Sequence, residues 1–235
     1  MKFAIKVSLV SLVSLLLCSS VWAARPFITD DAKITTEGSC QLENWMRVYS
    51  GSREFWALPA CNPTGNLEIT LGGGMARPNG GGSTGDSVLQ LKSLYQALRP
   101  NSWGLGLAVG TIRHRDLSPG PNGLGNHYAY LPFSASFSND KFILHSNLGW
   151  MRDRASSQHR TTFGLGGELQ LSPRLNLMTE TFGDDSARPF WQAGLRYFIV
   201  PNLFQIDATV GQQFGGDRSG RWISFGLRWT PERIL

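Results

Sequence analysis

The sequence predicts an all-β fold: a closed antiparallel transmembrane β-barrel of about twelve strands behind a cleaved signal peptide. Three observations predict it. Apolar and polar residues alternate through most of the chain, no long apolar run follows residue 23, and short and long connections take turns along the sequence. Because only helices and closed barrels satisfy every backbone group in lipid, strands that cross a membrane must form a closed barrel.

Residues 1–23 have the features of a signal peptide. Lys2 and Lys6 supply the charged start, residues 7–17 form an apolar run, and Val21-Trp22-Ala23 is a small-residue cleavage site. An uncleaved membrane anchor is the alternative, but the apolar run is shorter than the roughly 20 residues that a membrane helix needs. We therefore expect an exported protein whose mature chain begins at Ala24.

Residues 24–39 are polar and show no period, so we interpret them as a periplasmic N-terminal segment, a tail outside the barrel. The alternative is a segment that enters the barrel and narrows it. The barrel occupies residues 40–229, and a C-terminal tail, 230–235, follows. Its alternation predicts strands at 40–49, 53–61, 64–75, 87–98, 103–113, 127–138, 141–151, 160–171, 174–182, 189–199, 203–213 and 221–229.

The connections between these strands fall into two classes that alternate after the first hairpin. Short turns rich in Pro, Asn and Asp lie at 62–63, 99–102, 139–140, 172–173 and 200–202, and longer connectors at 76–86, 114–126, 152–159, 183–188 and 215–220. Outer-membrane barrels have short periplasmic turns and longer outer loops. The pattern therefore predicts the bacterial outer membrane, with the short turns and both chain ends in the periplasm.

The two faces of the strands differ. One face is apolar and ends in tryptophans, as a lipid-facing surface with aromatic belts does. The opposite face carries charges, and a basic group on the lipid side near the midplane would cost about 2–4 kcal/mol. We therefore predict an inward face that carries Glu43, Glu68, Lys92, Glu168, Glu180, Arg196, Asp207 and Arg228. Two roles stay open for these charges: pairing that fills a narrow barrel, and a polar lining that contacts a solute.

Two cysteines, Cys40 and Cys61, remain after cleavage, and in an oxidising compartment an even pair indicates a disulfide. A hairpin about Gly51 places residue 40 opposite residue 61, at the periplasmic end of the first two strands. The same spacing offers no metal site, and no metal or cofactor is implied.

Other site chemistries find little support. His145 and Ser146 are adjacent, so their side chains point to opposite faces of a strand and cannot form a catalytic dyad. The formal charge of +5 includes Lys2 and Lys6, and the remaining basic residues are scattered among acids, unlike a nucleic-acid-binding stripe. We therefore expect neither an enzyme nor a nucleic-acid-binding protein.

Several stretches resemble a family of proteobacterial outer-membrane proteins grouped with transporters of the phenol-degradation meta-pathway type. These are Arg25 to Ala32 (RPFITDDA), Cys40 to Glu43 (CQLE), Arg188 to Tyr197 (RPFWQAGLRY) and Gln205 to Gly211 (QIDATVG). The resemblance implies an outer-membrane barrel with a transport role and no catalytic residues. It implies that Glu43, Arg196 and Asp207 are inward charges typical of the group.

The sequence thus predicts a monomeric barrel that acts as a passive channel or transporter for small solutes, hydrophobic or aromatic ones among them. Two alternatives stay open: a plugged structural barrel that binds surface partners, and an outer-membrane lipid hydrolase. Expected partners are outer-membrane lipid, a small-molecule solute and the barrel-assembly machinery. Residues 222–229 suggest the assembly machinery as a partner, because they resemble the closing strand that it recognises. Such a strand usually ends the chain with an aromatic residue, and here residues 230–235 follow it.

Overall fold

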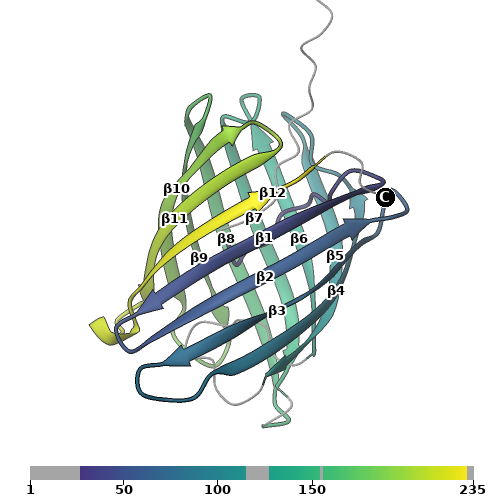
Figure 1. Cartoon of the computed structure of the whole chain (residues 1–235). Coiled ribbons are helices and arrows are strands. Elements are labelled where there is room, and N and C mark those ends of the chain that lie inside the picture. The colour runs from purple at the N-terminus through teal and green to yellow at the C-terminus, as the bar shows by residue number, and fades with distance from the viewer. Residues whose placement is uncertain (1–26, 115–126, 154–155, 232–235) are drawn as a thin grey trace, which may run out of the picture.

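The chain forms a closed barrel of twelve antiparallel strands (Figure 1). The structure is a computed structural model that describes residues 27–114, 127–153 and 156–231. The strands are β1 (Ser39–Tyr49), β2 (Ser52–Asn62), β3 (Glu68–Pro78), β4 (Thr84–Gln96), β5 (Trp103–His114), β6 (His127–Phe137), β7 (Phe142–Arg152), β8 (His159–Ser172), β9 (Leu175–Asp184), β10 (Phe190–Val200), β11 (Phe204–Gln213) and β12 (Trp222–Trp229). The predicted fold class and strand number are confirmed.

Each strand pairs with the next along the chain, and β12 pairs with β1 to close the ring. The only helix in the described part of the chain is the single 3-10 turn Arg218–Gly220, so no described helix is long and apolar enough to span a membrane. The signal peptide, the cleavage site, most of the 114–126 connector and the end of the C-terminal tail lie outside the described residues.

Burial follows the period of two that the sequence predicts. In β6, Leu131 is 47% exposed on the outer face while its neighbours Tyr130 and Pro132 are buried inside. The outer face is a belt of exposed apolar side chains around the ring, and it includes Trp103, Trp150 and Trp229 near strand ends. An apolar outer face on a closed wall is what a lipid environment requires.

The connection between β2 and β3 differs from the prediction. Strand β3 begins at Glu68 rather than at residue 64, so residues 63–67 form a longer turn, while the β3–β4 connection shrinks to residues 79–83. The strict alternation of short and long connections is therefore wrong here. The physical reason is local: the Asn62 side chain donates to the Thr35 carbonyl and accepts from the Gly65 N–H, which holds the chain in a wider turn.

The predicted disulfide is present. Cys40 lies directly opposite Cys61 in the β1–β2 ladder, and the two sulfurs are bonded. The bridge lies at the end of the barrel where β1 begins and β12 ends, which we call the terminal end; the opposite end, at the β1–β2 turn, we call the loop end (Figure 1).

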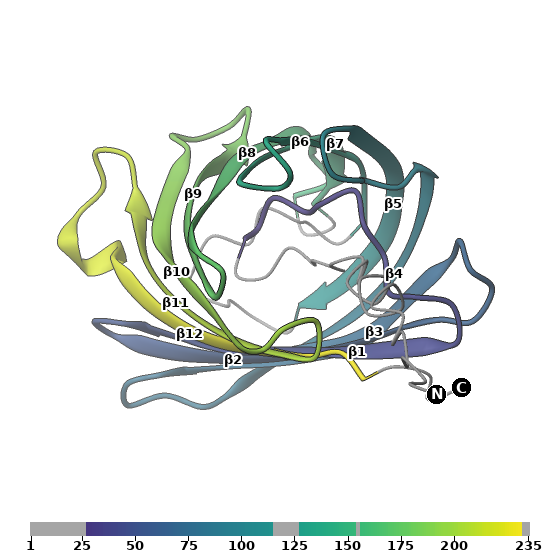
Figure 2. The same ribbon diagram turned by 90° about the horizontal axis from the view of Figure 1, so that it is seen from above.

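Residues 27–35, which we call the luminal segment, run inside the ring of strands (Figure 2). Phe27, Thr29, Asp31 and Ala32 are buried, and Ala32 is completely so. The interpretation of this stretch as a tail outside the barrel is therefore wrong for the described residues, and the alternative, a segment that enters the barrel, is right. Its lack of a period fits an extended chain surrounded by wall side chains on all sides.

The outward position of Leu131 at the middle of β6 gives a test of the lipid-facing surface. We expect Leu131→Arg to lower the free energy of unfolding in lipid vesicles by about 2–4 kcal/mol, because a guanidinium near the midplane loses its hydration. The measurement is urea unfolding followed by tryptophan fluorescence. Leu131→Met is the matched control and should change stability little; equal stability of both variants would contradict a lipid-facing Leu131.

Candidate functional site

The candidate site is the lumen of the barrel, where the eight predicted charges lie. Seven of them are buried on the inner face, and Glu43 is half-buried there. They come from β1, β3, β4, β8, β9, β10, β11 and β12, so they surround the lumen rather than gather on one side. The geometry decides what each of them contacts.

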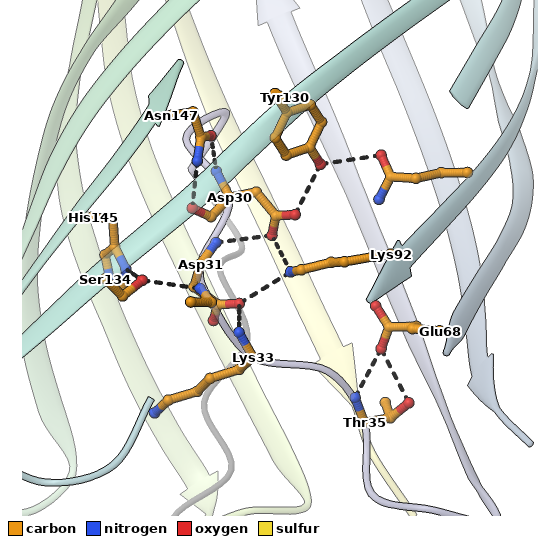
Figure 3. A network of polar contacts seen from close by, with 12 residues as sticks. Asp30, Asp31, Lys33, Thr35, Glu68, Lys92, Tyr130, Ser134, His145 and Asn147 are labelled. Atoms are coloured by element: carbon orange, nitrogen blue, oxygen red, sulfur yellow. Dashed lines mark hydrogen bonds and ion pairs between the residues drawn. The ribbon is translucent and has the colours of Figure 1, made fainter. Parts of the chain in front are cut away.

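One wall charge, Lys92, holds the luminal segment through ion pairs (Figure 3). Lys92 Nζ donates to Asp30 Oδ1 at 2.8 Å and to Asp31 Oδ1 at 3.3 Å. The Tyr130 hydroxyl donates to the other oxygen of Asp30 at 2.8 Å. A buried ammonium needs such partners, because an unpaired charge in this environment would be very costly.

Two wall carboxylates hold the segment by accepting from its backbone. Glu180 accepts the N–H of Ile28 at 2.7 Å and the N–H of Thr29 at 2.8 Å, one on each carboxylate oxygen. Glu68 accepts both the N–H and the hydroxyl of Thr35, at 2.8 and 3.0 Å. Hydrogen bonds to an ionised acceptor are roughly twice as strong as neutral ones, so these two carboxylates fix the segment near its two ends.

Uncharged wall groups satisfy the backbone between these two anchors. The Asn147 amide accepts the Asp30 N–H at 2.6 Å and donates to the Asp30 carbonyl at 2.9 Å. Ser134 Oγ accepts the Ala32 N–H at 2.9 Å, and the Ala32 carbonyl accepts the Leu98 N–H. The wall thus accepts five backbone N–H groups of the segment, and the segment's own Asp30 and Asp31 side chains accept those of Asp31 and Lys33, so the buried backbone is satisfied without sheet partners.

Four of the five remaining wall charges form two ion pairs, and the fifth, Asp207, lies opposite Arg196 in the β10–β11 ladder. Arg196 Nη1 donates to both oxygens of Glu168, at 2.8 and 2.9 Å, and Asn176 donates to the same carboxylate. Arg228 Nε donates to Gln41 Oε1 at 2.9 Å and lies 3.9 Å from Glu43. For this side of the lumen, the structure favours the pairing role over direct contact with a solute.

The structure also brings together a serine, a histidine and a glutamate. Ser134 Oγ lies 2.8 Å from His145 Nδ1, and His145 Nε2 lies 3.6 Å from Glu168. Ser134 is fully buried and its oxygen already accepts the Ala32 N–H, so a substrate cannot approach it in this arrangement. Sequence reasoning missed Ser134, although a hairpin about Asn139-Asp140 places residue 134 opposite 145. Ser146 lies on the other face of the strand from His145, as predicted.

Towards the loop end the wall is aromatic, and sequence reasoning missed this feature. The rings of Trp45 and Trp56 are stacked with centroids 5.6 Å apart, and those of Tyr128 and Tyr130 at 6.0 Å. With Val88, Ala108, Ile112 and Met151 they form one cluster, which we call the aromatic wall. The sequence contains a pattern that could have predicted it. Trp45 lies two residues from both Glu43 and Arg47 in the same strand, so it shares their inward face.

Glycines of the wall make room for these groups rather than for an open passage. A Cβ at Gly74 would lie 2.4 Å from the Trp56 ring, and one at Gly164 would lie 2.5 Å from Thr29 Oγ1 of the luminal segment. A cavity of about 30 Å³ remains between the segment and the wall, next to Tyr130, Asn147 and Phe182. With the segment in place, these two glycines therefore give space to a ring and to the segment rather than to a wider lumen.

Solved structures show the same fold. The KdgM porin aligns with 80% of this chain and 98% of its own, with a TM-score of 0.60 and 8% sequence identity. The COG4313 outer membrane channel from Pseudomonas putida F1 aligns with 86% of this chain and 98% of its own, with a TM-score of 0.54 and 12% identity. The NanC porin aligns with 81% of this chain and 98% of its own, with a TM-score of 0.53 and 9% identity. At such low identities the likeness concerns the fold.

The sequence comparisons place the chain in a family. The family model described as "Uncharacterised conserved protein UCP029691" matches residues 12–229, and the chain belongs to this family. No curated protein sequence matches the chain.

The ion pairs of Lys92 give a test of how the segment is held. We expect Lys92→Met to release the luminal segment, because it leaves Asp30 and Asp31 buried without their cation, and breaking a buried pair costs about 3–5 kcal/mol. When the segment is released, Lys33 becomes accessible to trypsin. Mass spectrometry then detects cleavage after Lys33 in a barrel that is still folded. Lys141→Met, an exposed lysine, is the matched control. Protection of Lys33 in Lys92→Met would contradict the proposed anchor.

Proposed function

We propose that this family member is a bacterial outer-membrane channel through which small solutes diffuse passively, with the luminal segment as the element that restricts the passage. One observation carries the proposal: a closed barrel with an apolar outer face encloses a charged and hydrogen-bonding interior, as a wall between lipid and a wet lumen must. The shared fold with porins and channels supports it.

The location and partners belong to the same proposal. The terminal end faces the periplasm and the loop end faces outward, with lipid around the apolar belt and the barrel-assembly machinery as the route of insertion. The protein works as a monomer and is not an enzyme. The resemblance of its sequence to transporters of the phenol-degradation meta-pathway type favours aromatic molecules among the solutes.

The contacts of the luminal segment suit a removable element. The wall holds it by ion pairs with Lys92 and by hydrogen bonds to Glu68, Glu180, Asn147 and Ser134. Water and ions can replace every one of these contacts once the lumen is hydrated, whereas an apolar plug would have to expose its side chains. Transport then needs no energy source: the segment moves aside and a solute diffuses along the polar wall.

The second candidate is a plugged structural barrel without transport. The observation in its favour is the same segment, which runs through the lumen (Figure 2) with a cavity of about 30 Å³ between it and the wall. The two candidates differ in one property, namely whether the segment leaves its place under the conditions in which the protein works.

A cysteine pair that ties the segment to the wall separates the two candidates. A Cβ at Gly164 would lie 3.2 Å from the Thr29 Cβ, close to the roughly 3.5–4.5 Å between the Cβ atoms of a disulfide. In planar bilayers we expect Thr29→Cys/Gly164→Cys to lose its conductance steps when oxidised and to regain them when reduced, because only the reduced form lets the segment move.

The single variant Thr29→Cys is the matched control, because it keeps the native Cys40–Cys61 bridge and meets the same reductant. Equal conductance of the oxidised and the reduced double variant would show that the segment does not restrict the passage. A folded wild-type barrel that is silent under all conditions would overturn the channel and leave the structural barrel.

A further inference from the structure

On its outer face the barrel carries charge at one end only. Among the described strands, every outward Arg, Lys, His, Asp or Glu lies within two residues of a strand end at the loop end, and all of them are basic and exposed. At the terminal end the outward side chains are uncharged, and rings such as Trp103, Phe137 and Trp229 lie there. The basic positions, which we call the basic rim, are Arg53 of β2, Arg77 of β3, Arg113 of β5, His127 of β6, Arg152 of β7 and His159 of β8.

An aromatic residue indicates the depth of this rim in the membrane. Trp150 and Arg152 lie on the same face of β7, and Arg152 is the next outward residue towards the loop end, about 7 Å further along the strand. Because interfacial rings mark the boundary between hydrocarbon and headgroups, Arg152 reaches the headgroup level. His127 of β6 and His159 of β8 lie directly opposite Arg152 in the two neighbouring ladders, so they share its depth.

Two arginines of the rim face each other. Arg53 and Arg77 are direct partners in the β2–β3 ladder, and on its other side Arg53 lies opposite the uncharged Val48 of β1. Like charges at directly opposite positions destabilise a sheet. Neither guanidinium forms a hydrogen bond or an ion pair with another described residue, so nothing in this part of the chain offsets the repulsion.

The acidic residues at this end do not neutralise the rim. Glu54 and Asp86 are buried on the inner face, and Asp185 and Asp217 lie in loops. No salt bridge joins any of these acids to a rim residue within the described ranges. The rim is therefore a surface at headgroup depth that is open to an anionic partner from outside the chain.

Resting on the outer-membrane location in the proposed function, we infer that the basic rim binds the phosphate groups of lipid headgroups in the leaflet around the loop end. The outer leaflet of this membrane is built from a phosphorylated glycolipid, whose phosphates lie at the level of the rim. Arginine suits this role, because its planar fork donates two parallel hydrogen bonds to one phosphate. Arg53 and Arg77 form the strongest point of the rim, since one phosphate between them satisfies both guanidinium groups.

Lipid A with and without its phosphate groups tests this inference. The full-length mature protein is refolded in a non-ionic detergent, and its dissociation constant for each form of the lipid is measured by native mass spectrometry. We expect the phosphorylated form to bind more tightly by about fivefold for each arginine that contacts a phosphate. Inorganic phosphate at the concentration of the lipid phosphate should not displace it, because the apolar belt holds the acyl chains only of a lipid.

The variant Arg53→Gln/Arg77→Gln should weaken binding of phosphorylated lipid A by about tenfold or more and leave binding of the dephosphorylated form unchanged. It removes a like-charge repulsion between exposed side chains, so it folds at least as well as the wild type, which circular dichroism checks. Arg99→Gln/Arg174→Gln, the same change of charge at two exposed arginines in turns of the terminal end, is the matched control and should bind as the wild type does.

Equal affinity of the wild type for both forms of lipid A, or equal weakening by the two double variants, would overturn the inference. Complete displacement by inorganic phosphate would overturn lipid as the occupant and assign the rim to a free anion. In each case conductance steps from the same protein would leave the channel function standing. Conversely, a barrel that binds phosphorylated lipid A as expected but stays silent in bilayers would keep the lipid site and remove the channel.

Discussion

The structure depends on one constraint: a sheet in lipid has no solvent to satisfy its edges, so β12 must pair with β1. Closure divides every strand into an outer face and an inner face. The outer face can be apolar without penalty, and apart from exposed arginines near strand ends, such as Arg53 and Arg152, the charges of the strands are left to a confined interior. There each charge must find a partner, because water is scarce and an unpaired buried ion is costly.

The luminal segment is the consequence of that confinement. Lys92 forms its ion pairs with Asp30 and Asp31 of the segment, and the Glu180 carboxylate accepts from two backbone N–H groups of the segment. The segment therefore completes the electrostatics of the wall while it fills the lumen. Most of the contacts that hold it are polar and can be exchanged for water; the buried Phe27 ring, which packs against His145, is the apolar exception.

The interior is also divided along its length. Paired charges such as Glu168 with Arg196 lie towards the terminal end, whereas Trp45, Trp56 and their neighbours line the loop end. Glycines in the wall provide the space for these inward groups: Gly74 leaves room for the ring of Trp56, and Gly164 leaves room for Thr29 of the luminal segment.

The sequence by itself determined the twelve strands, the face on which each charge lies and the partner of Cys40. These follow from a period of two and from turn positions, both of which are local properties of the chain. Two further features could have been predicted in the same way. A hairpin about residues 139–140 places Ser134 opposite His145, and a spacing of two from Glu43 places Trp45 on the inner face. Only the tertiary structure decided the place of residues 27–35 and the partners of Lys92, Glu68 and Glu180. That segment has no period, and its contacts join it to residues as much as 152 positions away, which no local pattern encodes.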